Sequence, residues 1–219
     1  MNKSVYIAFC ELAEVDYRKA VEIATDRLPL ALHKRFSDYL RLKDKALSCT
    51  AWLLLDAVLR QQTQGNVELL HHLEITAMGK PLLPQPYHFN LSHSGNIAVC
   101  AFTTNAAIGI DIEKHRKISE SEKEYLFQDQ NLSQFQSSPR SESFFDLWTR
   151  KESFLKACGI GLSDINIKTS TKGTTITIHD KGRNWYCETI SNFRDEYSLS
   201  ICMGEMNGSV ETVESYIFR

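Results

Sequence analysis

The sequence lacks the features that mark several broad classes of protein. It contains no apolar run long enough to cross a membrane, and its first residues show neither the apolar core nor the cleavage pattern of a signal peptide. Lys and Arg total 25 and Asp and Glu total 27, which gives a formal charge of −2. The chain therefore lacks the overall positive charge that would attract duplex nucleic acid. We therefore expect a cytoplasmic protein that binds neither membrane nor nucleic acid, and any anion site must be local.

Closely spaced cysteine pairs are also missing. None of the six cysteines forms a C-x-x-C pair, and most lie inside apolar runs. This pattern predicts buried thiols in a reducing compartment, and it argues against a disulfide framework or a cysteine zinc site. The six are Cys10, Cys49, Cys100, Cys158, Cys187 and Cys202.

The remaining composition is that of an ordinary globular protein. The 219 residues are 42% hydrophobic and 24% charged, which suits one large domain or two small ones with a buried core. Alternating apolar residues predict a strand at 5–10, and helical spacing runs from about 17 to 64, with a buried helix at 46–59. A hairpin follows at 88–102, with its turn at 94–96.

The second half of the chain shows the same kinds of pattern. Residues 106–113 predict a strand, and residues 143–158 predict a helix that Ser143 caps and Gly159 ends. The polar stretch between them predicts loosely packed helices or a loop, and the segments after the helix alternate like antiparallel strands.

A faint internal echo links the two halves. The tetrapeptide FNLS begins at Phe89 and YSLS begins at Tyr197, as a duplicated unit would leave behind. We therefore predict an α+β fold in which two similar α+β subdomains form a pseudodimer, each with an antiparallel sheet and packed helices. The predicted subdomains are residues 1–104 and 105–219.

The strand GIDIE places two carboxylates close together. Side chains alternate along a strand, so Asp111 and Glu113 share one face while Ile110 and Ile112 share the other. Two like charges at this spacing repel each other. One interpretation is a solvated strand end, and the other is a divalent cation between the two carboxylates.

The helix at 143–158 offers a third carboxylate and a lysine. Phe145, Trp148, Glu152 and Leu155 recur at helical spacing and share a face, and Lys156 lies one turn after Glu152. One interpretation is a surface ion pair beside the apolar stripe. The other makes Glu152 a third oxygen ligand of Mg²⁺, beside the two carboxylates of GIDIE.

Candidate phosphate-binding groups lie in the first half. Ser92 and His93 in FNLSHS offer a hydroxyl and an imidazole to a phosphate. The alternative is an ordinary hairpin with polar residues. A Ser–His hydrolase is disfavoured because neighbouring side chains in a strand face opposite ways, which is poor geometry for proton transfer. Lys80 precedes Pro81 in a rigid loop. A basic run supplies four further cations, Lys34, Arg35, Arg41 and Lys45. The alternative interpretation of this run is a solvated helix face.

Several motifs taken together resemble one family. GKPLLP, FNLSHS, IGIDIE and LWTRKESFLKACGIGL occur in an order and spacing similar to those of the larger, pseudodimeric 4′-phosphopantetheinyl transferases, over residues 34–163. The resemblance implies transfer of 4′-phosphopantetheine from coenzyme A to a serine of an apo acyl or peptidyl carrier protein, with release of 3′,5′-ADP. It implies Mg²⁺ or Mn²⁺, a monomer, and a role in fatty acid, polyketide or nonribosomal peptide synthesis.

The resemblance also implies roles at the reacting centre. By position, Asp111, Glu113 and Glu152 would hold the metal with the coenzyme A pyrophosphate. Lys156 would contact the phosphate and stabilise the transferring group. Glu152, or a water that it holds, would accept the proton of the carrier serine.

Further roles concern the coenzyme A nucleotide. By the same resemblance, Ser92 and His93 would bind its phosphates, with His93 on the 3′-phosphate, and Lys80 would flank it. Leu47 stands where the family usually has an arginine, so the basic run of Lys34 to Lys45 is our candidate for the missing charge. The segment at 125–128 replaces a Phe-Phe-Ser sequence that helps relatives bind the carrier.

Two other functions use the same residues. A metal-dependent phosphohydrolase acting on a nucleotide pyrophosphate would use these carboxylates with water as the nucleophile, although the sequence offers no second metal cluster. A non-catalytic module that binds coenzyme A or a carrier protein is the third hypothesis, and the retained carboxylates and Lys156 argue against it.

Overall fold

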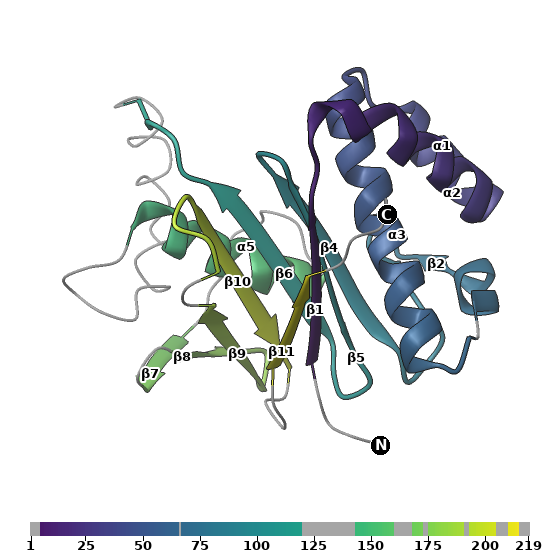
Figure 1. Ribbon diagram of the computed structural model, residues 1–219. Helices are drawn as coiled ribbons and strands as arrows, with labels where there is room; N and C mark the ends of the chain where they lie inside the picture. The colour runs from purple at the N-terminus through teal and green to yellow at the C-terminus, as the bar shows by residue number, and fades with distance from the viewer. Residues whose placement is uncertain are drawn as a thin grey trace. The chain divides into compact units, whose positions relative to one another are not determined.

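The chain forms two compact units in the computed structural model, one from residues 1–105 with 207–219 and the other from residues 106–206. Each unit combines a mainly antiparallel sheet with helices (Figure 1), which confirms the predicted α+β class. No helix in the described part of the chain is long and apolar enough to cross a membrane. The described residues are 5–65, 67–119, 143–159, 168–172, 175–190, 193–204 and 210–214.

The first unit contains a four-stranded sheet in the order β11-β1-β5-β4. The predicted hairpin is confirmed, because β4 and β5 pair in antiparallel fashion around the turn at 95–96. β11 runs parallel to β1, with Val210 opposite Val5, so this sheet takes a strand from beyond the second unit in sequence. The strands are β1 (Val5–Glu11), β4 (His88–Ser94), β5 (Ile97–Thr103) and β11 (Val210–Glu214).

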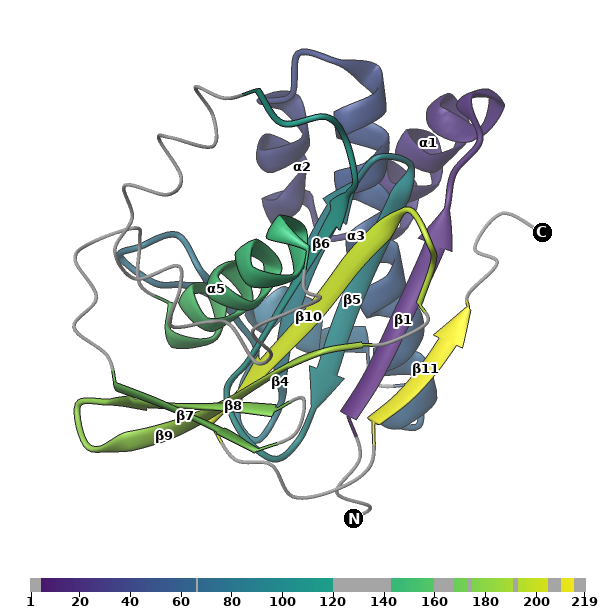
Figure 2. The same cartoon turned by 90° about the vertical axis from the view of Figure 1, so that its left-hand side faces the viewer.

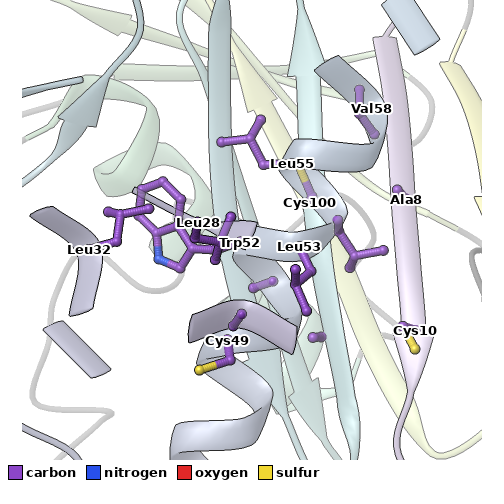
Figure 3. Close-up of a cluster of buried hydrophobic side chains, with 14 of the residues drawn as sticks. Ala8, Cys10, Leu28, Leu32, Cys49, Trp52, Leu53, Leu55, Val58 and Cys100 are labelled. Atoms are coloured by element: carbon purple, nitrogen blue, oxygen red, sulfur yellow. The ribbon is translucent and has the colours of Figure 1, made fainter. Parts of the chain in front are cut away.

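Helix α3 (Leu42–Gln62) organises the core of the first unit. It packs against β1, β4 and β5 and is buried on almost every side, as its dense apolar sequence predicts. Trp52 meets Phe89 of β4 edge to face, with ring centroids 5.7 Å apart. Figure 3 shows Trp52 among the buried side chains of this core, with Leu53 and Leu55 of the same helix. The other elements are η1 (Glu14–Asp16), α1 (Tyr17–Arg27), α2 (Leu30–Ser37), η2 (Val67–His72) and the short pair β2 (Glu74–Ile75) and β3 (Pro81–Leu82).

The second unit contains a five-stranded antiparallel sheet in the order β6-β10-β9-β8-β7. The turn between β8 and β9 is the predicted one, with positive φ at Lys181 and Gly182. The turn predicted at Lys172–Gly173 and most of the polar stretch before the helix, residues 120–142, lie outside the described residues. The strands are β6 (Ile108–Lys114), β7 (Lys168–Lys172), β8 (Thr175–Asp180), β9 (Arg183–Thr189) and β10 (Tyr197–Met203).

Helix α5 (Phe144–Cys158) lies across one face of this sheet, over β6, β10 and β9 (Figure 2). The predicted ends are confirmed. Ser143 forms a reciprocal capping box with Asp146, and Gly159 closes the helix with a φ of 70°.

The face of α5 that meets the sheet differs from our prediction. We expected a stripe of large side chains through Phe145 and Trp148, but both are only half-buried. The fully buried positions include Thr149, Ser153 and Ala157, which recur every fourth residue. Small side chains on this face let the helix approach the sheet closely. A search for large apolar residues at helical spacing does not detect such a face.

The prediction that all cysteines remain thiols is wrong for one pair. Cys187 of β9 and Cys202 of β10 are direct partners across the ladder, with Cα atoms 4.1 Å apart, and form a disulfide. Cross-strand partners are close whatever their separation in sequence, so spacing could not indicate the pair. Cys10, Cys49, Cys100 and Cys158 form no disulfide.

Candidate active site

Glycine at position 109 allows β6 to touch the backbone of α5. A Cβ atom there would lie 2.0 Å from the carbonyl oxygen of Ser153 and 2.4 Å from the nitrogen of Ala157. No side chain fits at these distances, so only glycine permits this approach. The contact brings β6, with Asp111 and Glu113, against the second half of α5.

The buried carboxylate of Asp111 and the ammonium of Lys156 meet across this contact. Lys156 Nζ donates to Asp111 Oδ1 at 2.5 Å and to the carbonyl oxygen of Ile110 at 3.4 Å. The side chain of Asp111 is 6% exposed and that of Lys156 is 30% exposed. Lys156 therefore pairs with the strand, which adds a contact that the i,i+4 spacing with Glu152 did not predict.

Glu152 lies close enough to both strand carboxylates to feel their charge. Burial raises the pKa of Glu152, Asp111 raises it further, and Glu113 adds a smaller increase, while Lys156 and Lys151 oppose these effects. The three carboxylates predicted to act together are thus electrostatically coupled. Glu113 and Glu152 are both half-buried, so they remain accessible from solvent.

The predicted metal triad stays a prediction. Among the residues that the structure describes, no group of three or more His, Cys, Asp and Glu side chains is arranged to hold a metal ion. In this arrangement the buried Asp111 carboxylate pairs with the Lys156 ammonium.

A hydrogen-bonded network beside these carboxylates was not predicted. Ser198 Oγ donates to Asp146 Oδ1 at 2.5 Å and contacts His115 Nε2 at 2.9 Å. The His115 ring stacks on Phe145, with centroids 5.1 Å apart. The only local signal was the Ser-x-x-Asp cap at 143–146; the strand partner comes from tertiary structure.

A second link in this network lies one turn further along α5. Thr149 Oγ1 and Ser200 Oγ are 2.8 Å apart, and Ser200 Oγ is 3.0 Å from Thr189 Oγ1. Ser198 and Ser200 stand opposite Glu113 and Asp111 in the ladder. The hydroxyl groups therefore occupy the same face of the sheet as the acidic pair.

In the first unit, the structure brings His93 beside the basic run. The rings of Tyr39 and His93 meet edge to face, with centroids 6.4 Å apart. Tyr39 also lines an open pocket with Arg35 and Asp38. Arg35 and His93 thus both lie near Tyr39 and offer groups that suit an anion, whereas the Asp38 carboxylate of the same pocket opposes one.

The other candidates of the first unit are more scattered. Lys34 and Arg41 are exposed and Lys45 is half-buried. Ser92 is buried and, as the strand neighbour of His93, points to the opposite face of β4.

Lys80 lies at the other end of β4. Burial, and to a smaller degree the charge of Lys80, lowers the pKa of His88. His93 lies five residues after His88, about 17 Å along the strand. The backbone nitrogen of Lys80 donates to Thr76 Oγ1. Lys80 and the Arg35–His93 group would therefore contact different parts of an extended ligand.

Comparison with known proteins relates the second unit to one superfamily. Residues 107–202 match the model of the 4′-phosphopantetheinyl transferase superfamily. This segment contains all four of Asp111, Glu113, Glu152 and Lys156. The resemblance found in the sequence is therefore confirmed.

Individual relatives support the larger class of these transferases. The chain is 36% identical to 4′-phosphopantetheinyl transferase gsp of Aneurinibacillus migulanus over 131 residues, 58% of this chain and 54% of that protein. It is 42% identical to 4′-phosphopantetheinyl transferase Sfp of Bacillus subtilis (strain 168) over 90 residues, 39% and 40% of the two chains. The chain spans about half the length of these relatives.

A longer match extends to an animal protein. The chain is 26% identical to the L-aminoadipate-semialdehyde dehydrogenase-phosphopantetheinyl transferase of Xenopus laevis over 206 residues, 80% of this chain and 67% of that protein. All three relatives are named as phosphopantetheinyl transferases, and none of these names supports the phosphohydrolase alternative.

Proposed function

We propose that the protein transfers the 4′-phosphopantetheine group of coenzyme A to a serine hydroxyl of an apo acyl or peptidyl carrier protein. The observation that carries this proposal is the coupled cluster of Asp111, Glu113, Glu152 and Lys156 within the segment that matches the superfamily. Three carboxylates and a lysine suit chemistry on a pyrophosphate, where charge neutralisation and positioning supply most of the catalysis.

The carboxylates fit Mg²⁺ or Mn²⁺ as the metal. Asp111 and Glu113 raise the pKa of Glu152 by repulsion, and a divalent cation between the three would offset that repulsion. Such a cation would neutralise charge on the coenzyme A pyrophosphate. Asp111, Glu113 and Glu152 are the residues that would hold it.

The chain's own residues then bind, orient and move a proton. The serine Oγ forms a bond to the β-phosphorus, the bond from that phosphorus to the bridging oxygen breaks, and 3′,5′-ADP leaves. The proton of the serine passes to Glu152 or to a water that it holds; the raised pKa of Glu152 favours its role as base. Lys156, one-third exposed, donates to the phosphoryl oxygens.

The first unit would bind the nucleotide. Arg35, which shares a pocket with Tyr39, and His93, whose ring meets that of Tyr39, would hold the 3′-phosphate, and Lys80 would contact a more distant part of coenzyme A. Ser92, Lys34, Arg41 and Lys45 remain candidates for further phosphate contacts. Charge-assisted hydrogen bonds from arginine suit this task because they can be bidentate.

We further propose that residues 1–104 and 105–219 correspond to the two subdomains of such a transferase. The compact-unit boundary at 105–106 supports the join between the two, whereas residues 207–219 group with the first unit. We place the protein in the cytoplasm, since four cysteines outside the disulfide are thiols, which is typical of a reducing compartment. The family resemblance implies a monomer.

The test is a transfer reaction with purified protein, coenzyme A, Mg²⁺ and a panel of apo acyl and peptidyl carrier proteins. Intact mass spectrometry should show the gain of one phosphopantetheine on a carrier, and a chelator should abolish it. Glu152→Gln should lower the rate about 10³-fold without loss of fold. If no carrier gains mass and coenzyme A does not bind, the proposal fails; hydrolysis of coenzyme A without a carrier would establish the phosphohydrolase instead.

A further inference from the structure

We propose that Ser198 is a positioning residue, which fixes the two elements that carry the metal-binding carboxylates relative to each other. The proposal rests on the proposed function and concerns the hydrogen-bonded network beside the site. Ser198 is 2% exposed, and its hydroxyl contacts are additional to its backbone pairing with Glu113 in the ladder.

One hydroxyl joins three segments of the second unit. Ser198 belongs to β10, and it contacts Asp146 in the first turn of α5 and His115 directly after β6. A hydroxyl has one proton, so while it donates to the Asp146 carboxylate it must accept from His115. His115 therefore carries its proton on Nε2, and the direction of the chain runs from His115 through Ser198 to Asp146.

This chain holds the ends of both ligand-bearing elements. His115 follows Glu113 by two residues, and its backbone nitrogen also donates to the backbone carbonyl oxygen of Glu196 at 2.8 Å. Asp146 accepts from the backbone nitrogen of Ser143 at 3.1 Å and so anchors the start of α5 as well. Loss of the Ser198 hydroxyl would therefore remove one contact to the strand that carries Glu113 and one contact to the helix that carries Glu152 at once.

The other attachments of α5 lie on the far side of Glu152. The contact of Gly109 with Ser153 and Ala157 and the pairing of Lys156 with Asp111 hold the C-terminal half. Ser198 and the Thr149–Ser200 bond hold the N-terminal half. Glu152 lies between these two groups of contacts, so its position relative to Glu113 depends on both.

The expected consequence concerns the cation requirement. Removing a group that orients metal ligands typically weakens metal binding by about 10-fold or more. Ser198→Ala should therefore raise the Mg²⁺ concentration for half-maximal activity about 10-fold, with less effect on the KM for coenzyme A. Ser198→Thr, which keeps the hydroxyl, should restore most of the wild-type value.

Two further variants separate positioning from general stability. His115→Phe keeps the stacking on Phe145 but loses the hydrogen bond, and it should give a smaller shift in the same direction. Thr189→Val loses the hydroxyl contact between Thr189 of β9 and Ser200 of β10, a hydrogen bond that joins two strands and includes neither α5 nor β6. It should lower Tm to a similar degree as Ser198→Ala while the Mg²⁺ dependence stays unchanged.

The experiment measures Tm, the Mg²⁺ activation curve and the binding of Mn²⁺ by electron paramagnetic resonance with coenzyme A present. Weaker Mn²⁺ binding in Ser198→Ala and His115→Phe, but not in Thr189→Val, supports the proposal. A wild-type metal dependence in Ser198→Ala overturns it, and His115→Phe decides if Ser198→Ala does not fold. If the wild-type protein modifies no carrier and binds no Mn²⁺, the proposed function itself fails and this proposal falls with it.

Discussion

The two units present their charged residues in different ways. In the second unit, the carboxylates and Lys156 lie at a tight contact between β6 and α5, and each is wholly or partly buried. In the first unit, Lys34, Arg35 and Arg41 are exposed on α2 and the segment after it. Substitutions at the tight β6–α5 contact should therefore disturb stability and chemistry together, whereas those of Lys34, Arg35 and Arg41 should change ligand affinity alone.

The largest effect is expected at Gly109. Gly109→Ala would place a methyl group 2.0 Å from a backbone oxygen of α5, so the helix must move away from the strand. We expect a loss of more than about 3 kcal/mol of unfolding free energy in urea. Gly182→Ala is the matched control, because nothing lies within 4 Å of its Cβ and only its positive φ opposes alanine; it should cost about 1 kcal/mol.

A somewhat smaller loss should follow Lys156→Met. Removing the ammonium leaves the buried Asp111 carboxylate without its ion-pair partner, which costs about 3 kcal/mol. The double variant with Asp111→Asn should recover much of this stability in urea unfolding, but no transfer activity. Equal stabilities of Lys156→Met and the wild type would show that the pair contributes nothing to the fold.

The sequence alone predicted much of the second unit's architecture but only part of its contacts. The caps of α5 and the alternation of GIDIE are local patterns, so the helix ends and the shared face of Asp111 and Glu113 followed from them. The pairing of Lys156 with Asp111 and the steric need for Gly109 arise between segments far apart in sequence. Periodicity carries no information about such distances.

The same reasoning explains what was missed elsewhere. The parallel pairing of β11 with β1 and the disulfide between Cys187 and Cys202 join segments that no local pattern connects. The small side chains of α5 were overlooked because hydrophobic periodicity gives weight to large residues. In the first unit, the basic run was visible in the sequence. Arg35 differs from the other cations of that run because it shares a pocket with Tyr39, whose ring meets the ring of His93.

That distinction gives the next prediction. Arg35→Ala should weaken coenzyme A binding about 10-fold, as expected for loss of one charge-assisted hydrogen bond to a phosphate. Arg41→Ala should weaken it less than about threefold, because an exposed charge outside the pocket acts only through a screened field. Isothermal titration calorimetry checks both, with Tm unchanged in each. Equal effects would mean that the basic run attracts coenzyme A as a whole and that no single arginine binds it.

The smallest effect concerns His88, which has no role in the proposed chemistry and so reports on the first unit's fold alone. Burial and the nearby charge of Lys80 lower the pKa of His88 from its ordinary 6.5. At this position, the unfolded chain therefore binds more protons than the folded chain below pH 6.5. The folded state has its full stability above that pH, where His88 is neutral in both states, and loses stability as the pH falls through the lowered pKa. We expect His88→Gln to flatten the fall in urea stability between pH 6.5 and 5 by less than about 1 kcal/mol. Lys80→Met should flatten it less, because burial is the larger cause of the shift. If both variants follow the wild-type pH profile, the acid-sensitive group of the first unit lies elsewhere than at the start of β4.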